Sequence, residues 1–251
     1  MSGHSKWAGI KHKKAIIDKK KGKVWTKAVR EITIAAKLGG GDPDANPRLR
    51  RAIDDAKASN MPAENVKRAI QKGTGEIPGV VFEELTFEGY GPGKVAIYCE
   101  GSTDSRNRTT NEIRHIFEKN GGSMGTAGTV AFLFEKKGYI TVKKSAIGED
   151  ELLGLVLDLG AEDLKSTESD LYEILTAPAD YDAVVKGVEA KGLEPESKSI
   201  TMLPNTTVSV GQENAGALLK LIETLEDNDD ISNVYTNFDI PDDVLAALEQ
   251  D

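Results

Sequence analysis

Apolar residues recur with the period of an α-helix in three successive stretches near the start of the chain. The first stretch covers residues 24–38 and ends at a run of three glycines. The second begins at Pro47, with Asn46 in position to cap it. The third covers residues 62–72 and is expected to end at Gly73. Because short helices depend on packing between their apolar faces, we expect the three to form one small unit.

The period then changes to that of β-strands. Strands are predicted over residues 82–88 and 94–100, joined as a hairpin by the glycine-rich turn 89–93. A helix over 109–119 and a strand over 129–134 follow. These elements have the order β-β-α-β, which leaves the sheet incomplete.

Residues 138–203 predict a complete unit of their own. Its elements are strands over 139–142 and 199–203, helices over 149–159 and 181–191, and a hairpin over 163–176. The resulting order, β-α-β-β-α-β, is ferredoxin-like. The last elements are a strand over 207–210, a helix over 215–225 and a strand over 231–238. They can complete the earlier sheet or form a third sheet domain, and we favour the first arrangement because a remnant of about 35 residues is near the lower size limit of a stable domain.

The predicted fold class is therefore α+β with three domains, an N-terminal helical domain followed by two ferredoxin-like α/β domains, one inserted in the other. The predicted boundaries are 1–77 for the basic tail and three-helix domain, 78–136 plus 206–240 for the discontinuous α/β domain, and 137–205 for the inserted domain. A length of 251 residues agrees with two or three compact domains.

Charge is divided unevenly along this chain. Residues 1–76 contain eighteen Lys and Arg against eight Asp and Glu, a local charge of +10 in a chain with a net charge of −9, so the remainder carries −19. A basic segment attracts phosphate and an acidic one repels it, which points to nucleic acid as the partner of the N-terminal part.

Several other classes of function lack the residues they need. The single cysteine, Cys99, excludes an internal disulfide framework, and we expect it to be buried in a strand. Three histidines cannot build a Cys/His zinc site without carboxylates. The sequence shows no nucleophile with a nearby base, no paired acid and base, and no metal-ligand spacing. We therefore expect neither enzymatic activity nor a cofactor. No apolar run reaches the roughly 18 residues of a membrane span, and a cytoplasmic monomer is expected.

The candidate nucleic-acid-binding residues form two groups. The first lies near the N-terminus, where Trp7 and His12 can stack on bases among lysines that can neutralise phosphates. Its members are Lys6, Trp7, Lys11, His12, Lys13, Lys14, Lys19, Lys20, Lys21, Lys23, Lys27 and Arg30. The alternative is a solvated tail, since many lysine runs bind nothing. The second group is Arg106, Arg108, Arg114 and Lys119 at a predicted helix. These side chains can grip phosphate or pair with carboxylates of their own domain, and both readings stay open.

Three other motifs have competing explanations. The segment 89–94 (GYGPGK) lies between strands and opens no helix, so a tight turn is favoured over a phosphate loop. The glycine-rich run 120–128 can contact a partner or be a mobile loop. Asp227, Asp229 and Asp230 can recruit a cation or form a solvated turn, and their spacing fits no calcium loop.

Several strings together resemble one family. They are GHSKW at 3–7, AKLGGGDPDANPRLR at 36–50, GYGPG at 89–93, the segment 103–109 and GAED at 160–163. In this order they are similar to YebC/PmpR proteins over nearly the whole chain. Ser105, where Asn is usual, and Lys94, where Gly often follows Gly93, depart from the family pattern.

The resemblance implies three domains and no enzymatic activity. It also implies a regulator of gene expression, either a DNA-binding transcriptional regulator or, as in the related mitochondrial translational activator, a factor that acts at the ribosome. Our leading hypothesis is a non-enzymatic nucleic-acid-binding protein that docks through its basic N-terminal part on ribosomal RNA or promoter DNA. The absence of a base-reading helix and the acidic body slightly favour structured RNA. The rival hypothesis is a protein-interaction module that does not bind nucleic acid.

Overall fold

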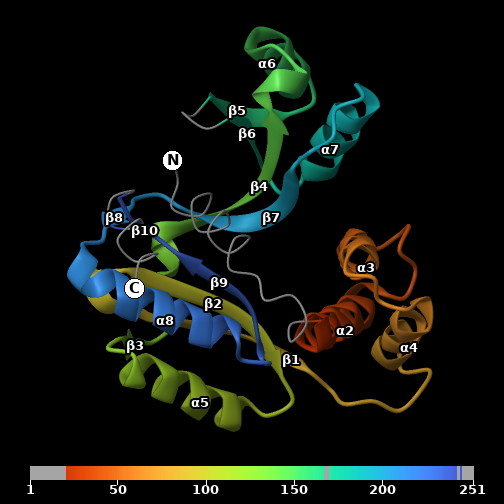
Figure 1. The fold of residues 1–251 in the computed structure, drawn as a ribbon. Helices are drawn as coiled ribbons and strands as arrows, with labels where there is room; N and C mark the ends of the chain where they lie inside the picture. Colours follow the sequence, from red (N-terminus) through yellow and green to blue (C-terminus); the bar gives the residue numbers. More distant parts are fainter. Residues whose placement is uncertain (1–20, 167–169, 242–243, 245–251) are drawn as a thin grey trace.

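The structure, a computed structural model, describes residues 21–166, 170–241 and 244 (Figure 1). It is a mixed fold of helices and sheets, and both four-stranded sheets are antiparallel. Within these residues no helix is long and apolar enough to cross a membrane.

The N-terminal helices pack against one another as the helical unit, residues 21–74. Its helices are α2 (Lys21–Gly39), α3 (Pro47–Ala58) and α4 (Ala63–Thr74). Their shared core includes Ile32, Leu49, Met61 and Ala69. The predicted cap of α3 is confirmed, because Oδ1 of Asn46 accepts a hydrogen bond from the Leu49 amide at 3.1 Å.

Gly73 has a different role from the predicted one. It lies inside α4, and the helix ends instead at Gly75, whose φ of 82° is left-handed. A Cβ on Gly73 would lie 2.4 Å from the Thr33 carbonyl oxygen and 2.7 Å from the Cβ of Ala36, both on α2. Gly73 is therefore needed for close contact between α2 and α4.

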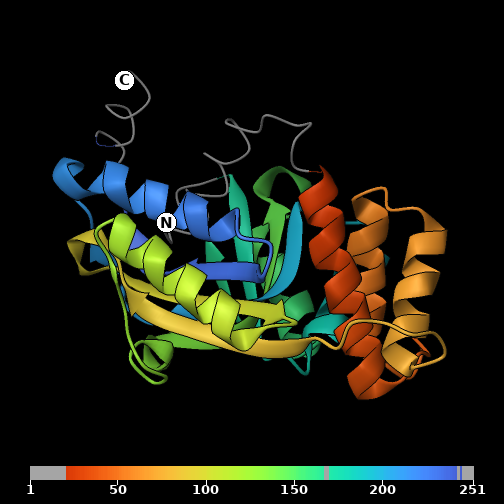
Figure 2. The ribbon, with the colours of Figure 1, turned by 90° about the horizontal axis from the view of Figure 1, so that it is seen from below.

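The first four-stranded sheet belongs to the first sheet unit, residues 83–133 and 208–239. Its strand order is β3-β1-β2-β9. The elements are β1 (Glu83–Tyr90), β2 (Ala96–Thr103), α5 (Arg106–Lys119), β3 (Ser123–Met124), α8 (Gln212–Glu226) and β9 (Ile231–Thr236). Helices α5 and α8 lie side by side over one face of the sheet, as Figure 2 shows. The predicted hairpin is confirmed by the antiparallel register of β1 and β2.

Two strand predictions in this unit are wrong. Residues 129–134 do not form a strand of this sheet. Ala131–Leu133 form a short 3-10 helix, and the Glu88 carboxylate fixes its start by accepting hydrogen bonds from the amides of Gly128, Val130 and Ala131. The predicted strand at 207–210 does not complete the sheet. It is the short β8 (Val208–Ser209), which pairs in parallel with β10 (Phe238–Asp239).

The inserted unit, residues 134–204, has the predicted element order. Its elements are β4 (Phe134–Lys143), α6 (Glu149–Asp158), β5 (Ala161–Ser166), β6 (Leu171–Thr176), α7 (Tyr181–Ala190) and β7 (Ser197–Pro204). The sheet order β5-β6-β4-β7 places the first and third strands in the centre. This β-α-β-β-α-β arrangement agrees with the ferredoxin-like pattern. By contrast, the elements of the first sheet unit follow a different order, so only the inserted unit shows that pattern.

Each unit has its own hydrophobic core. A smaller apolar cluster joins the two sheet units, with Ala96 and Tyr235 from the first and Phe134 from the second. Side chains alternate along β2, so Ile97 and Cys99 face the helices while Ala96 faces this joint. The predicted burial of Cys99 is confirmed. Whether the three units are independent domains stays a prediction.

Candidate nucleic-acid interface

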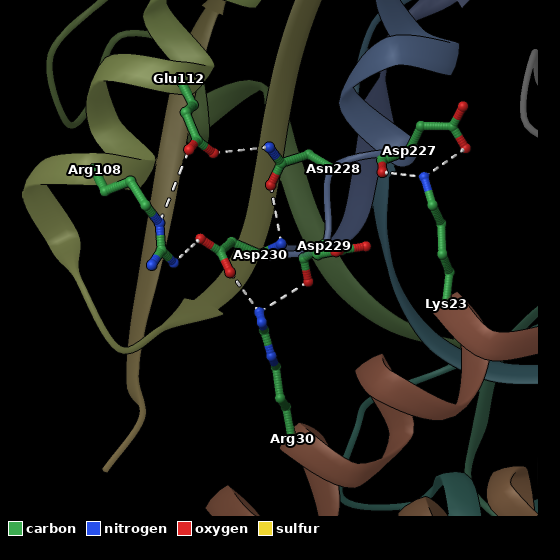
Figure 3. A pocket seen from close by; sticks show the side chains of 8 residues that line it. All are labelled: Lys23, Arg30, Arg108, Glu112, Asp227, Asn228, Asp229 and Asp230. Carbon is green, nitrogen blue, oxygen red and sulfur yellow. Dashed lines mark hydrogen bonds and ion pairs between the residues drawn. The ribbon is translucent and has the colours of Figure 1, made fainter. Parts of the chain in front are cut away.

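Three basic residues of the first predicted group lie on one face of α2. Lys23, Lys27 and Arg30 are spaced by four and three residues, which places them on the same side of a helix. That side faces the C-terminal end of α8. Lys23 Nζ donates a hydrogen bond to the Asp227 carbonyl oxygen at 2.8 Å (Figure 3). Lys27 Nζ donates to the Glu226 carbonyl oxygen at 2.6 Å. These lysines bind the last carbonyl groups of α8, which lack partners within the helix and favour cations.

Arg30 makes the most extensive of these contacts. Its Nη1 donates to the carbonyl oxygens of Ser102 at 3.0 Å and Asp229 at 2.9 Å, and to Oδ1 of Asp230 at 2.5 Å. Its guanidinium also lies 5.2 Å from the centre of the Phe82 ring. Only 15% of the Arg30 side chain is exposed, so this residue joins the helical unit to the first sheet unit.

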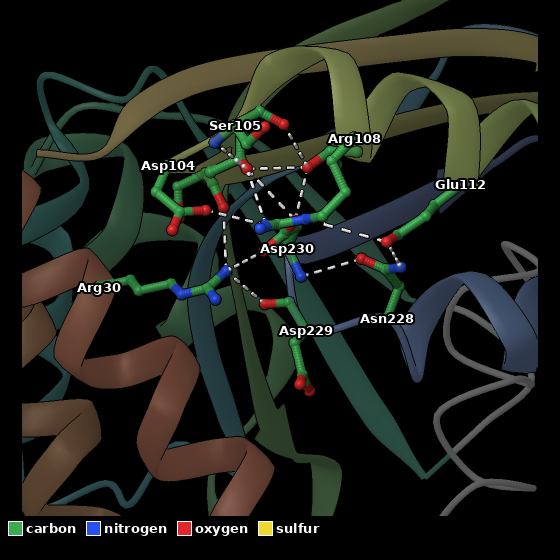
Figure 4. Close-up of polar contacts among 11 residues, drawn as sticks. Arg30, Asp104, Ser105, Arg108, Glu112, Asn228, Asp229 and Asp230 are labelled. Carbon is green, nitrogen blue, oxygen red and sulfur yellow. Dashed lines mark hydrogen bonds and ion pairs between the residues drawn. The ribbon is translucent and has the colours of Figure 1, made fainter. Parts of the chain in front are cut away.

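Asp230 is the acceptor at the centre of this network (Figure 4). Besides Arg30, its carboxylate accepts hydrogen bonds from Thr109 Oγ1 at 2.5 Å, Arg108 Nη2 at 2.8 Å and Thr103 Oγ1 at 3.2 Å. Burial alone would raise the pKa of Asp230, but the hydrogen bonds from Thr109, Arg108 and Arg30 lower it to about 2. Asp230 is therefore a structural anion that orders the start of α5, the end of β2 and α2 together.

The loop that carries Asp230 is fixed by its backbone. The Ser102 amide donates to the Asp230 carbonyl oxygen at 2.8 Å, and the Asp230 amide donates to Asn228 Oδ1 at 2.9 Å. At Gly101 a Cβ would lie 2.2 Å from the same carbonyl oxygen, so a glycine is required for this approach. Within the predicted cluster of Asp227, Asp229 and Asp230, the Asp230 carboxylate is already bound by hydrogen-bond donors of the protein. Among the described residues, no group of three or more His, Cys, Asp or Glu is arranged to hold a metal ion.

A pocket of about 370 Å³ lies at this junction. Figure 3 shows its lining residues, Lys23, Arg30, Arg108, Glu112, Asp227, Asn228, Asp229 and Asp230. Three cations face four carboxylates in this pocket. In this arrangement the pocket does not favour an anion.

The second predicted group divides in two. Arg106 Nη2 pairs with Glu83 at 2.9 Å, and Arg108 pairs with Asp104 as well as with Asp230. By contrast, Arg114 contacts only the Asn111 side chain, at 3.4 Å, and no ion pair or hydrogen bond is found for the exposed Lys119 side chain within the described residues. Carboxylate pairing thus accounts for the first two arginines, while the other two cations of α5 face solvent.

Most of the first predicted group lies outside the described residues. These residues are Lys6, Trp7, Lys11, His12, Lys13, Lys14, Lys19 and Lys20. Lys21 is described only as the first residue of α2. Trp25 is partly buried against the core of the helical unit, and its Nε1 donates to the Ser59 carbonyl oxygen at 3.1 Å. Nucleic-acid binding by the predicted residues stays a prediction.

The sequence reasoning missed a further set of exposed cations on the helical unit. Lys37 on α2 and Lys67, Arg68 and Lys72 on α4 are exposed, with no ion pair or hydrogen bond from these side chains in the described part of the chain. The signal was available, since 68 and 72 are one helical turn apart on the polar face of α4. The denser run of lysines before residue 24 masks this signal in the sequence.

Three arginines of α3 were also missed. Arg48 pairs with Glu31 and Glu84, both at 2.7 Å. Arg50 and Arg51 both approach Asp182 of the inserted unit, at 3.5 and 3.3 Å. The helical unit therefore contacts both sheet units through ion pairs, and no sequence signal links residues so far apart.

Known proteins resemble the chain along its length. Residues 5–76 match the model of the TACO1/YebC protein N-terminal domain, and residues 82–238 match that of the TACO1/YebC second and third domain. A relative from Desulfatibacillum aliphaticivorans is 55% identical over 246 residues, 98% of this chain and 99% of its own. Another, from Elusimicrobium minutum, is 50% identical over 251 residues, which is 100% of both chains.

Both relatives are named probable transcriptional regulatory proteins, not enzymes, in agreement with the predicted lack of enzymatic activity. The crystal structure of a conserved hypothetical protein from Aquifex aeolicus matches with a TM-score of 0.81 and 46% identity, over 93% of this chain and 96% of that one. Family models that together match residues 5–76 and 82–238, with relatives this similar, identify the chain. It belongs to the TACO1/YebC family.

Proposed function

We propose that this regulator acts by binding nucleic acid through its basic N-terminal part, residues 1–76. The observation that carries the proposal is the division of charge, +10 in this part against −19 in the remainder. The exposed cations of the helical unit, Lys37, Lys67, Arg68 and Lys72, support it because they have no carboxylate partner among the described residues. They add to the phosphate contacts predicted for the basic residues from Lys6 to Lys21. Arg114 and Lys119 of α5 supply two further exposed cations for the proposed binding surface.

The proposed contacts are mostly to phosphate. At the start of α5, Arg106 pairs with Glu83 and Arg108 with buried Asp230, which leaves no row of side chains free to read base edges there. Discrimination then comes from the shape of the nucleic acid. The acidic sheet units would be repelled by a long uniform duplex, whereas proteins and ions break up the field around ribosomal RNA. Structured RNA, at the ribosome, is therefore the favoured target over promoter DNA.

The proposal includes three domains, with the boundaries predicted from sequence. Its support is the separate core of each unit and the exposed segment that connects α4 to β1.

A second candidate is a protein-interaction module. The observation that favours it is the internal pairing of Lys23, Lys27 and Arg30, since these cations already serve the fold. In this case the N-terminal charge keeps the chain soluble and contributes no nucleic-acid affinity.

Salt titration separates the two candidates. If about six to eight phosphates are neutralised, the logarithm of the affinity for RNA should fall against the logarithm of salt concentration with a slope of about −4 to −7. Changing Lys67, Arg68 and Lys72 to Gln should reduce the magnitude of the slope by about 3. The matched control changes Lys143, Lys191 and Lys198 of the inserted unit, which are paired with carboxylates, and should leave the slope unchanged. A flat salt response in the unaltered protein would exclude nucleic-acid binding.

Crosslinking in cells distinguishes RNA from DNA. Crosslinks from the N-terminal lysines to ribosomal RNA are expected. Recovery of a discrete set of promoters without ribosomal RNA would instead establish a transcriptional regulator.

A further inference from the structure

The contacts between the helical unit and the rest of the molecule are polar. No hydrophobic cluster of the described residues combines side chains from before residue 75 with side chains from after residue 82. The two sheet units, by contrast, share an apolar joint around Phe134 and Tyr235. Ion pairs at a surface contribute little and are weakened by salt, so the helical unit is the less firmly attached part.

The segment that connects α4 to β1 permits movement. Residues 75–82 form neither helix nor strand, and Val80 and Val81 are 55% and 71% exposed. Such exposed connections at the ends of elements are where hinges lie.

We propose that Lys23, Lys27 and Arg30 form a latch that holds the helical unit closed and that nucleic-acid phosphates release. This inference rests on the proposed function and adds its regulation. In the closed form these cations bind the end of α8 and the loop after it. In the open form the same three side chains bind phosphate, so binding and opening are one event.

Competition by phosphate is chemically favourable. Lys23 and Lys27 donate hydrogen bonds to neutral carbonyl oxygens, and Lys23 Nζ also lies 3.9 Å from Oδ1 of the exposed Asp227. A charged phosphate oxygen is a stronger acceptor for an ammonium group than a carbonyl oxygen. The released carbonyls lie at a helix end beside exposed Asp227, where water can replace the lysines.

Release of Arg30 leaves no buried charge without a partner. After Arg30 departs, Asp230 retains hydrogen bonds from Arg108, Thr109 and Thr103. Removal of a partner from a buried ion is costly only when that ion is left alone. The network around Asp230 therefore belongs to the first sheet unit, and Arg30 is its detachable member.

The closed form also shields the cations from polyanions. Asp227 and Asp229 are exposed beside them, and carboxylates outnumber cations in the pocket at the junction. A phosphate that approaches the closed latch meets this negative charge first. The latch is thus autoinhibitory, and the exposed cations elsewhere on the helical unit make the first contact.

A distance measurement tests the opening directly. Spin labels are attached to cysteines in Ala63→Cys on α4 and Ala217→Cys on α8, both exposed positions outside the latch. Cys99 is fully buried and takes no label in the folded protein. Addition of a saturating RNA hairpin, or of a DNA duplex of equal charge, should shift the distance distribution beyond its width in the free protein. Binding without any shift would overturn the latch and leave the proposed function intact.

A covalent bridge tests the consequence for affinity. Val24→Cys and Ser232→Cys place thiols on α2 and β9 at two residues that line one pocket of about 270 Å³, without removal of a latch residue. After reaction with a short bismaleimide, the affinity for the hairpin should fall at least about tenfold, and the magnitude of the salt slope should fall by at most about 3, the limit of one for each latch cation. Each single-cysteine variant treated with the same reagent is the control.

The outcomes separate the two proposals. Equal affinity of bridged and control proteins refutes the latch alone. Failure of the unbridged protein to bind either nucleic acid refutes the proposed function, and the latch with it.

Discussion

Replacement of Asp230 by Asn is the most informative test of the network at the junction. The carboxylate accepts hydrogen bonds from Arg30, Arg108, Thr109 and Thr103. Burial alone would raise its pKa, but the bonds from Thr109, Arg108 and Arg30 lower it from the ordinary 3.8 to about 2. A tenfold change in proton affinity corresponds to about 1.4 kcal/mol, so this difference stabilises the folded state by about 2 kcal/mol at neutral pH. Asp230→Asn should remove about that amount, because the amide is neutral and offers one acceptor oxygen.

The pH dependence gives the prediction its sign. A carboxyl group whose pKa is lowered by folding contributes stability above its unfolded pKa, and that contribution is lost as pH falls toward the folded pKa. For Asp230 the loss should occur between about pH 4 and pH 2. Urea unfolding followed by circular dichroism at pH 7 and pH 3 should therefore show a smaller difference between variant and unaltered protein at the lower pH.

Asp229→Asn is the matched control. It removes the same charge from the neighbouring residue, which is exposed and contributes only its backbone carbonyl oxygen to Arg30. Its free energy of unfolding should change by less than about 0.5 kcal/mol. Equal stability of the two variants at pH 7 would refute the role assigned to the Asp230 carboxylate.

Three further predictions follow from the packing. Gly73→Ala should destabilise the helical unit by about 1 to 3 kcal/mol, because the alanine Cβ would meet the Thr33 carbonyl oxygen. Urea unfolding followed by tryptophan fluorescence measures this, and an unchanged midpoint would contradict it. Burial alone would raise the pKa of Glu88, but hydrogen bonds from the amides of Val130 and two neighbours lower it. Glu88→Gln should therefore reduce the free energy of unfolding by about 1 to 2 kcal/mol at pH 7 and by less in acid, measured by the same assay. Burial raises the pKa of Cys99, so a thiol reagent should modify it only in denaturant, and rapid modification of the folded protein would argue against that burial.

The features that sequence predicted correctly depend on residues close together in the chain. Asn46 followed by Pro47 fixes the start of α3 through a bond that spans three residues. The hairpin of β1 and β2 follows in the same way from its glycine-rich turn. The helix end assigned to Gly73 failed because the glycine serves a distant contact with α2, and a helical pattern does not report what packs against it.

The candidate site shows the same division. The spacing of Lys23, Lys27 and Arg30 places them on one face of α2, but nothing local indicates that this face meets the end of α8, about 200 residues later in the chain. The sequence around Asp230 is likewise typical of a solvated turn, because the donors that bind its carboxylate come from distant parts of the chain. Its burial depends on the close approach that Gly101 permits, and no pattern in the 227–230 segment reveals it.

The charge of the N-terminal part therefore overstates what is available to a ligand. Lys23, Lys27 and Arg30 count toward the +10 of residues 1–76, yet each already has an acceptor within the protein. If phosphate displaces these acceptors, counterions leave the nucleic acid, but the exposed Asp227 carboxylate, 3.9 Å from Lys23 Nζ, recruits a cation in exchange. The salt slope of the unaltered protein should then be shallower than a count of phosphate contacts predicts, whereas the exposed cations of α4 contribute in full. On the proposed latch mechanism, the basic segment should bind polyanions less indiscriminately than its charge implies, because part of the binding free energy is needed to open the molecule.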